Sequence, residues 1–140
     1  MLKILFLISF LIIHQSYADD DKSHKKSEKK SRHAASEASE EQIKNGKKVF
    51  QRKACGGCHK IGGEDTASVG PNLKDVEKRR DPKWVRQWIK DPRILQAAND
   101  PIYVELLKKY PTKMPYLKLS DSDIEDVLKY IDSESKKKGK

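Results

Sequence analysis

The sequence predicts an all-α domain, and three observations support this fold class. From about residue 41 onward, apolar residues recur at the three- and four-residue spacing of helices that bury one face. Serine or an aspartate–proline pair precedes several of these stretches, and these residue types cap and start helices. No stretch shows the convincing alternation of apolar and polar residues that indicates a β-strand. We therefore expect about four to five helices joined by loops.

The N-terminal 40 residues are expected to lie outside this domain. Residues 1–18 combine Lys3, an apolar run over residues 4–13 and a small-residue end, which is the pattern of a secretory signal peptide cleaved after Ala18. The apolar run is shorter than the ~20 residues of a membrane span, although its retention as an uncleaved anchor stays open. Residues 19–40 contain no Leu, Ile, Val, Phe or Trp, so we expect a charged, disordered tether.

The remaining segment, residues 41–140, has the length of one small domain. It holds 23 Lys and Arg against 15 Asp and Glu, in a chain whose formal net charge is +9. Nucleic acid is not an expected partner, because acidic residues are dispersed among the basic ones and no binding motif accompanies them. A domain of this size has only a modest core of its own, so a buried cofactor would supply much of the apolar centre.

The first helix is expected to open with a capping box, in which Ser39 is followed three residues later by Gln42. We expect this helix to run directly into Cys55. The glycine-rich stretch that follows, ending at residues 70–73, predicts a loop that passes close to something flat. The inward face of the first helix is expected to consist of Ile43, Gly46, Phe50 and Ala54.

The later helices are marked by the same kinds of start signal. One begins at Asp81-Pro82 and is ended or bent by Asp91-Pro92, and the next begins at Asp100-Pro101 and stops before Pro111. The last begins at Ser120 and has acidic residues near its positive end. The expected inward faces, in the same order, are Trp84, Val85, Trp88 and Ile89; Ile102, Tyr103, Leu106, Leu107 and Tyr110; and Ile124, Val127, Leu128 and Ile131.

Residues 55–59 read Cys-Gly-Gly-Cys-His, and this pentapeptide predicts the covalent attachment of one haem c. Two thiols three positions apart can each add to a vinyl group of haem, and a histidine directly after the second can ligate the iron. The predicted attachment sites are Cys55 and Cys58, and the predicted iron ligand is His59. These are the only two cysteines, so attachment would leave no thiol for another role.

Three alternatives for the same residues are less favoured. A structural zinc site usually needs a second pair of ligands downstream, but the remaining histidines, His14, His24 and His33, all precede the domain. A thioredoxin-like dithiol would lie near a βαβ pattern, and no strand precedes Cys55. A disulfide within Cys-x-x-Cys closes too small a loop to restrain much of the unfolded chain.

Met114 is the candidate for the second axial ligand of the iron. Once Met1 has left with the signal peptide it is the only methionine, and it lies between Pro111 and Pro115 rather than on an apolar helix face. Flanking prolines restrict the backbone, and a weak bond between a thioether and iron needs a loop that moves little. Ordinary packing of Met114 and an open distal face of the haem are the alternatives.

With these motifs in place, the segment from Glu41 to Ser135 resembles the class I c-type cytochromes, a family of monohaem proteins. The resemblance rests on residues 55–59, on Lys-Met-Pro at 113–115 and on Gly-Pro-Asn-Leu at 70–73. It implies the cytochrome c fold, in which the helices wrap around one covalently bound haem c. It also implies that the first helix crosses the last one, with the contact made by Gly46, Phe50 and Tyr130.

The resemblance further implies roles for three residues around the cofactor. The carbonyl of Pro71 would accept a hydrogen bond from the far nitrogen of His59 and so orient its ring. Trp84 and Trp88 look like the aromatic residues that wall the haem edge, one of them reaching a propionate, although plain core packing accounts for both equally well. The segment from residue 91 to 110 is longer than in the shortest members of the family.

A haem iron held by His59 and Met114 would pass single electrons. Thioether sulfur favours ferrous iron and raises the reduction potential, and iron with both axial positions filled binds no substrate. The resemblance therefore implies a monomeric periplasmic electron carrier, not an enzyme, between a quinol-oxidising complex or dehydrogenase and a terminal oxidase or reductase. The alternatives are a haem c subunit of a larger oxidoreductase and, if Met114 is not bound, a ligand-binding haem protein.

The expected partners are redox proteins with acidic docking surfaces. Membrane contact is expected only through a redox complex or an uncleaved signal anchor. Lysines close in sequence to the attachment motif and to Met114 would steer such partners to the haem edge. These lysines are Lys47, Lys48, Lys53, Lys60, Lys113 and Lys118.

Overall fold

The computed structural model describes residues 39–63 and 69–137, which belong to one compact unit. The predicted signal peptide, its cleavage after Ala18 and nearly all of the predicted tether lie outside the described residues. Within them the chain is helical and contains no strand, which confirms the all-α prediction. A helix over residues 39–52 is followed by the short 3-10 turn η1 (Cys55–Gly57) and by α2 (Val76–Arg79), α3 (Pro82–Lys90), α4 (Pro92–Ala97), α5 (Pro101–Lys109) and α6 (Asp121–Lys136).

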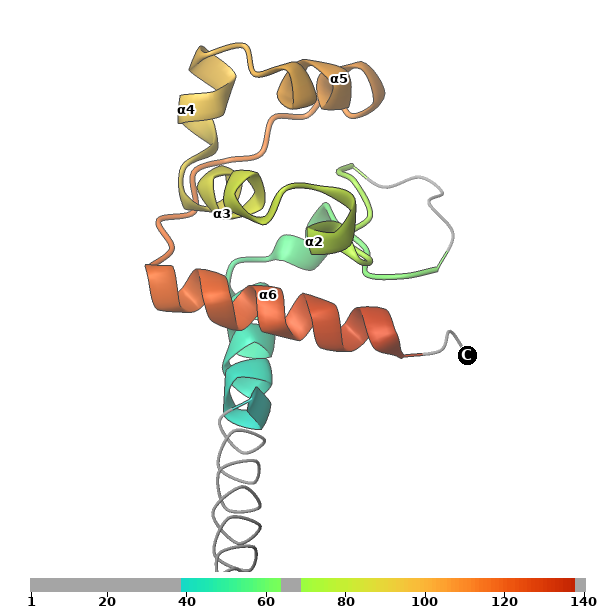
Figure 1. Cartoon of the computed structure of the whole chain (residues 1–140), viewed down its shortest axis with the longest axis vertical. Helices are drawn as coiled ribbons and strands as arrows, with labels where there is room; N and C mark the ends of the chain where they lie inside the picture. The colour runs from blue at the N-terminus through green and yellow to red at the C-terminus, as the bar shows by residue number, and fades with distance from the viewer. Residues whose placement is uncertain (1–38, 64–68, 138–140) are drawn as a thin grey trace, which may run out of the picture. The chain divides into compact units, whose positions relative to one another are not determined.

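The N-terminal helix, residues 39–52, crosses α6 in direct contact (Figure 1). Gly46 lies at the crossing, where a Cβ atom would fall 1.9 Å from the backbone oxygen of Asp126 and 2.8 Å from the Cβ of Tyr130. Beside this point the rings of Phe50 and Tyr130 meet edge to face, with centroids 5.5 Å apart. The crossing predicted from Gly46, Phe50 and Tyr130 is therefore confirmed.

Two expectations for the N-terminal helix are wrong. Ser39 is itself helical, whereas a capping residue must have a non-helical backbone, so no capping box opens at this position. The helix also ends at residue 52 instead of running into Cys55, because Ala54 adopts the left-handed conformation with φ 54° and ψ 32°. Ala54 consequently lies beyond the helix, where it lines the cavity described below, and the inward face is completed by Val49, which is 3 % exposed.

The aspartate–proline pairs start three successive helices. Asp81, Asp91 and Asp100 each accept a hydrogen bond from a backbone N–H in the first turn that follows, at 2.9, 3.1 and 3.0 Å. Asp91-Pro92 thus ends α3 and at once begins α4, a helix that the sequence did not reveal. The short helices α2 and α4 are the reason that the described part holds six α-helices rather than the four to five predicted.

The apolar core is centred on α6. Ile124, Val127, Leu128 and Ile131 are 2–4 % exposed, as their helical spacing predicts, and they pack with Val49, Val85 and Leu119. Ser120 caps α6 in a reciprocal capping box with Asp123. In Figure 1, α3 lies between α6 on one side and the pair α4 and α5 on the other. None of the helices in the described ranges is long and apolar enough to cross a membrane.

Candidate haem-binding site

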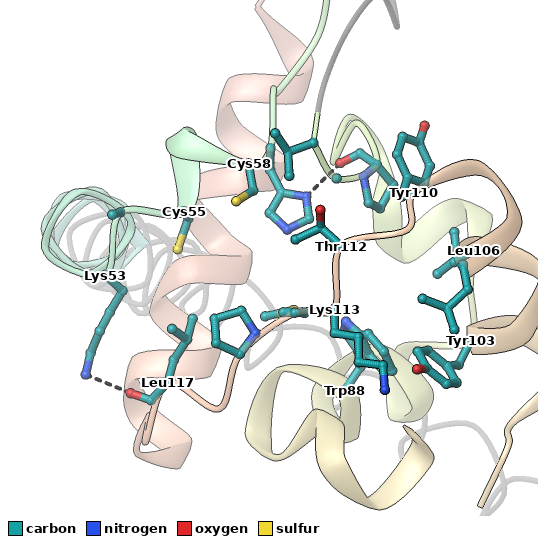
Figure 2. A pocket seen from close by; sticks show the side chains of 18 residues that line it. Lys53, Cys55, Cys58, Trp88, Tyr103, Leu106, Tyr110, Thr112, Lys113 and Leu117 are labelled. Atoms are coloured by element: carbon teal, nitrogen blue, oxygen red, sulfur yellow. Dashed lines mark hydrogen bonds between the residues drawn. The ribbon is translucent and has the colours of Figure 1, made fainter. Parts of the chain in front are cut away.

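One cavity of about 360 Å³ brings together most of the residues that the sequence predicted for the site. Cys55, Cys58 and His59 line it together with Pro71 and Met114, although these residues come from three separate segments of the chain. Figure 2 shows the sulfurs of Cys55 and Cys58 on one side of the cavity and the side chains of Trp88, Tyr103 and Leu106 on the other. The volume is within the range of about 300–1,000 Å³ that is usual for cofactor pockets.

The ring of His59 is held in one orientation and one tautomer. Its Nδ1 lies 2.8 Å from the carbonyl oxygen of Pro71, and because a carbonyl can only accept, Nδ1 must carry the proton. The lone pair is therefore on Nε2, the nitrogen available to a metal. Burial lowers the pKa of His59, which keeps the imidazole neutral, and the hydrogen bond to Pro71 opposes this effect. The predicted contact between His59 and Pro71 is confirmed.

Gly70 lets the loop pass flat against the His59 ring. A Cβ atom at this position would lie 2.7 Å from Cε1 of His59 and 3.0 Å from its Nδ1, too close for any other residue. Asn72 links this loop to Gly62 through two hydrogen bonds, both of 3.1 Å. Its side-chain oxygen accepts a hydrogen bond from the backbone N–H of Gly62, and its side-chain nitrogen donates one to the Gly62 carbonyl. The flat object predicted beside this glycine-containing stretch is thus the imidazole.

Cys55 and Cys58 sit at the start of the 3-10 turn η1 and just after its end. Both are half-buried, and no disulfide joins their sulfurs. Burial raises the pKa of the Cys55 thiol, so in the protein without cofactor the protonated form predominates at neutral pH. Among the residues that the structure describes, no group of three or more His, Cys, Asp and Glu side chains is placed to hold a metal ion.

Met114 lies in a segment without regular secondary structure, residues 111–118, which we call the methionine loop. Its side chain is half-buried and lines the cavity together with the neighbouring Lys113 and Pro115. Lys53, also half-buried, donates from Nζ to the carbonyl oxygen of Leu117 at 2.8 Å, a bond that Figure 2 marks with a dashed line. The sequence placed Lys53 with the docking lysines, whereas the structure shows it bracing the methionine loop.

The two tryptophans occupy different positions. Trp88 lines the cavity, whereas Trp84 is not among the lining residues and stacks on the outer side of Trp88, with ring centroids 5.3 Å apart and planes 8° apart. Trp84 donates its indole N–H to Oδ1 of Asp100 at 3.1 Å, so that group is already used within the protein. Of the two, only Trp88 is placed to wall a haem.

One wall of the cavity consists of residues that the sequence did not predict to line the site. This wall is provided by α5, in the segment from residue 91 to 110 that is longer than in the shortest members of the family. Its apolar stripe was predicted to face inward, and the structure shows that several of its members line the cavity. The lining residues from this segment are Tyr103, Leu106, Leu107 and Tyr110.

Residues 43–135 match the cytochrome c family. The chain belongs to this family. Among solved structures, it is 27 % identical to cytochrome c from Rhodothermus marinus, with a TM-score of 0.57 over 67 % of this chain and 77 % of that one. It is 29 % identical to a cytochrome c domain from Pseudomonas putida, with a TM-score of 0.58 over 64 % of this chain and 87 % of that domain. These matches confirm the cytochrome c fold.

A curated relative is cytochrome c oxidase subunit 2 of Alkalihalophilus pseudofirmus, which is 28 % identical over 105 residues. The match covers 69 % of this chain but only 27 % of that subunit, so the chain spans about a quarter of the length of this relative.

Membership of the family implies haem c, and the residues of the cavity fit this group. Two sulfurs are available for thioether bonds, an imidazole presents Nε2 as its unprotonated nitrogen, and a thioether from Met114 lines the same space. The walls between them are largely aliphatic and aromatic side chains. A planar, mostly apolar cofactor with iron at its centre has the chemistry that this arrangement accommodates.

Proposed function

We propose that this protein is a periplasmic one-electron carrier in which His59 and Met114 ligate the iron of a single haem c attached through Cys55 and Cys58. The observation that carries the proposal is the shared cavity. The methionine loop and the attachment motif are far apart in the sequence, yet both line the same apolar space. A thioether and an imidazole on one haem favour the ferrous state and leave no position for a substrate.

Each part of the chain has a defined task in this mechanism. When bound, haem c supplies a metal centre that gains and loses one electron. Pro71 holds His59 in the tautomer that ligates, and Lys53 ties the N-terminal helix to the methionine loop. The apolar walls from α3 and α5 exclude water and disfavour extra positive charge on the iron, which raises the reduction potential. Trp88, which lines the cavity, is the tryptophan that would wall the haem.

Ligation can be tested on the mature protein produced in a cell that attaches haem. An alkaline pyridine spectrum together with the intact mass reports the pigment type, the covalent linkage and removal of the signal peptide. The ferric protein should show the weak near-infrared band of a thioether bound to iron, and the ferrous protein should bind carbon monoxide poorly.

Replacing Met114 by alanine should abolish the near-infrared band, allow rapid binding of carbon monoxide and lower the reduction potential. Lys108→Ala, an exposed position of α5 that does not line the cavity, is the control and should leave all three properties unchanged. If Met114→Ala retains the band and excludes carbon monoxide, Met114 is not the ligand. Because carbon monoxide is still excluded, that result would not support a ligand-binding haem protein with an open distal face either.

We further propose that acidic redox partners dock beside the methionine loop and the attachment motif. Lys53 is left out of this surface because it is engaged with Leu117. The remaining predicted lysines are all exposed, namely Lys47, Lys48, Lys60, Lys113 and Lys118. Electron exchange with an acidic partner should slow as ionic strength rises, because salt screens the attraction. A rate that does not change with salt contradicts the docking proposal.

A second candidate function is supported by the match to cytochrome c oxidase subunit 2. In that case the same haem domain would be a subunit of a larger oxidoreductase rather than a free monomer. Purification from the native membrane in mild detergent separates the two candidates. A free carrier elutes as a monomer, whereas a subunit elutes with partner chains at fixed stoichiometry.

A further inference from the structure

We propose that Gln96 on α4 is a positioning residue that holds Met114 in place through a hydrogen bond from its side-chain amide to the Met114 carbonyl. This inference rests on the ligation of iron by His59 and Met114 proposed above. Gln96 is half-buried, and its Nε2 lies 3.1 Å from the carbonyl oxygen of Met114. The hydrogen bond therefore holds the backbone of the candidate ligand residue directly.

The methionine loop depends on side chains for its position. Among the described residues, residues 111–118 take part in no backbone–backbone hydrogen bond. From the described part of the chain, two side-chain hydrogen bonds reach this loop, from Gln96 to Met114 and from Lys53 to Leu117. The guanidinium of Arg93 lies 3.9 Å from the centre of the Tyr116 ring. A segment that lacks a backbone ladder opens at low cost unless such contacts hold it closed.

Helix α4 is itself fixed before it meets the loop. Pro92, its first residue, is fully buried, and Asp91 caps the helix. Asp91 also accepts two hydrogen bonds from the Arg93 side chain, at 2.8 and 2.7 Å, which fixes the guanidinium under the Tyr116 ring. Gln96 follows Arg93 by three positions and is therefore on the same face of the helix. The helix presents two pre-oriented side chains to successive parts of the loop.

The expected consequence concerns how often the loop opens. The iron opens to an added ligand most fully when the backbone of Met114 moves away with its thioether, and this movement breaks the hydrogen bond from Gln96. Loss of one such bond should raise the population of the open form about five- to tenfold. Carbon monoxide reacts with ferrous iron only when the methionine position is open, so its binding rate measures that population directly.

The test compares variants of the mature holoprotein by the rate of carbon monoxide binding, the near-infrared band, the reduction potential and the denaturation midpoint. Gln96→Glu has the same shape but replaces the donating amide by a carboxylate, and it should bind carbon monoxide at least about fivefold faster than wild type. Gln96→Lys keeps an N–H donor and should restore a rate close to that of wild type. Gln87→Glu, with the same charge change at an exposed position of α3, is the matched control.

The outcomes distinguish the two proposals. A wild-type protein without the near-infrared band, and open to carbon monoxide, overturns the ligation of iron by Met114. A wild-type protein with the band, but with equal rates for Gln96→Glu and Gln87→Glu, overturns only the role of Gln96. If Gln96→Glu binds carbon monoxide faster but its free energy of unfolding falls by an amount that accounts for the whole acceleration, the role of Gln96 is overturned as well. Gln96→Met, which removes the amide without adding charge, provides the same comparison if the charged variant fails to mature.

A double-variant experiment tests whether Gln96 affects carbon monoxide binding through Met114. In the Met114→Ala background the iron is open already, so Gln96→Glu should produce no further acceleration. A further acceleration of the same size would show that Gln96 acts on the cavity in general and would overturn its assignment as a positioning residue for Met114.

Discussion

Replacing Gly46 by alanine tests whether close backbone contact between the N-terminal helix and α6 holds the fold together. The added Cβ would lie 1.9 Å from the backbone oxygen of Asp126 and 2.8 Å from the Cβ of Tyr130. Neither atom can be moved by rotating a side chain, so the two helices would have to separate. The shortfall from ordinary van der Waals contact is about 1.5 Å or more.

The cost can be estimated from two opposing effects. Alanine is intrinsically better than glycine inside a helix by about 1 kcal/mol. Forced backbone displacement in a packed interior costs about 1–3 kcal/mol and occasionally more, and here it also loosens the core around Val49. Because the clash involves backbone, we expect the upper end of this range, about 3 kcal/mol. After subtraction of the helix gain of about 1 kcal/mol, the net loss is about 2 kcal/mol. This is a large share of the roughly 5–15 kcal/mol that stabilises a domain.

The assay is denaturant unfolding of the holoprotein followed by far-ultraviolet circular dichroism. Gly57→Ala is the matched control, because a Cβ at that position meets nothing within 4 Å. The control should change the free energy of unfolding by no more than about 0.5 kcal/mol. Equal midpoints for the two variants would refute the argument that the crossing is too tight for a methyl group.

Three further predictions concern the site and the contacts that support it. Gly70→Ala should push the His59 ring aside, since its Cβ would lie 2.7 Å from Cε1, and should reduce the haem content per polypeptide measured by pyridine spectrum and mass; unchanged content contradicts this. Arg86→Ala should destabilise the protein by about 1 kcal/mol, because Arg86 joins Glu125 at 2.6 and 2.9 Å and Glu77 at 2.7 Å. Since Arg86 holds the pKa of Glu125 below its ordinary value of 4.5, this stabilisation is present above pH 4.5 and is lost as the pH falls further. In urea unfolding across this range, the free energies of unfolding of the wild type and the variant should converge as the pH falls. A difference that stays constant with pH counts against the ion pair. Asp100→Ala should cost about 2 kcal/mol in thermal unfolding, because it removes the cap of α5 and the acceptor of the Trp84 indole, whereas Asp100→Asn keeps an oxygen and should cost less than half as much; equal losses would assign the effect to charge alone.

Local signals predicted the helices well where they act over one or two turns. The caps at Asp81, Asp100 and Ser120 bond within their own first turn, and the stripe on α6 turned out to be the buried core. The same rules missed α4, because Asp91 both ends one helix and begins the next. They also misplaced Ala54, since alanine is not a residue whose type indicates a left-handed backbone.

The candidate site was predictable in its chemistry but less so in its surroundings. The thiols and the imidazole of residues 55–59 are adjacent in sequence, so their joint role does not depend on the rest of the fold. Trp84 and Trp88 present identical side chains one helical turn apart, and only packing shows that Trp88 faces the cavity while Trp84 is engaged with Asp100. Lys53 was assigned to the surface on its charge, whereas its reach to a carbonyl 64 positions away needed coordinates.

The sequence by itself predicted the attachment chemistry, the helical class and Met114 as the second ligand candidate, because each prediction depends on residue types within a few positions. The tertiary structure alone decided that the methionine loop lines the same cavity as Cys55 of η1, and that Gln96, Arg93 and Lys53 are the side chains that hold this loop. The physical reason is the range of the interactions. Caps and helical stripes form within one or two turns, whereas the closing of a loop depends on which distant helices pack together.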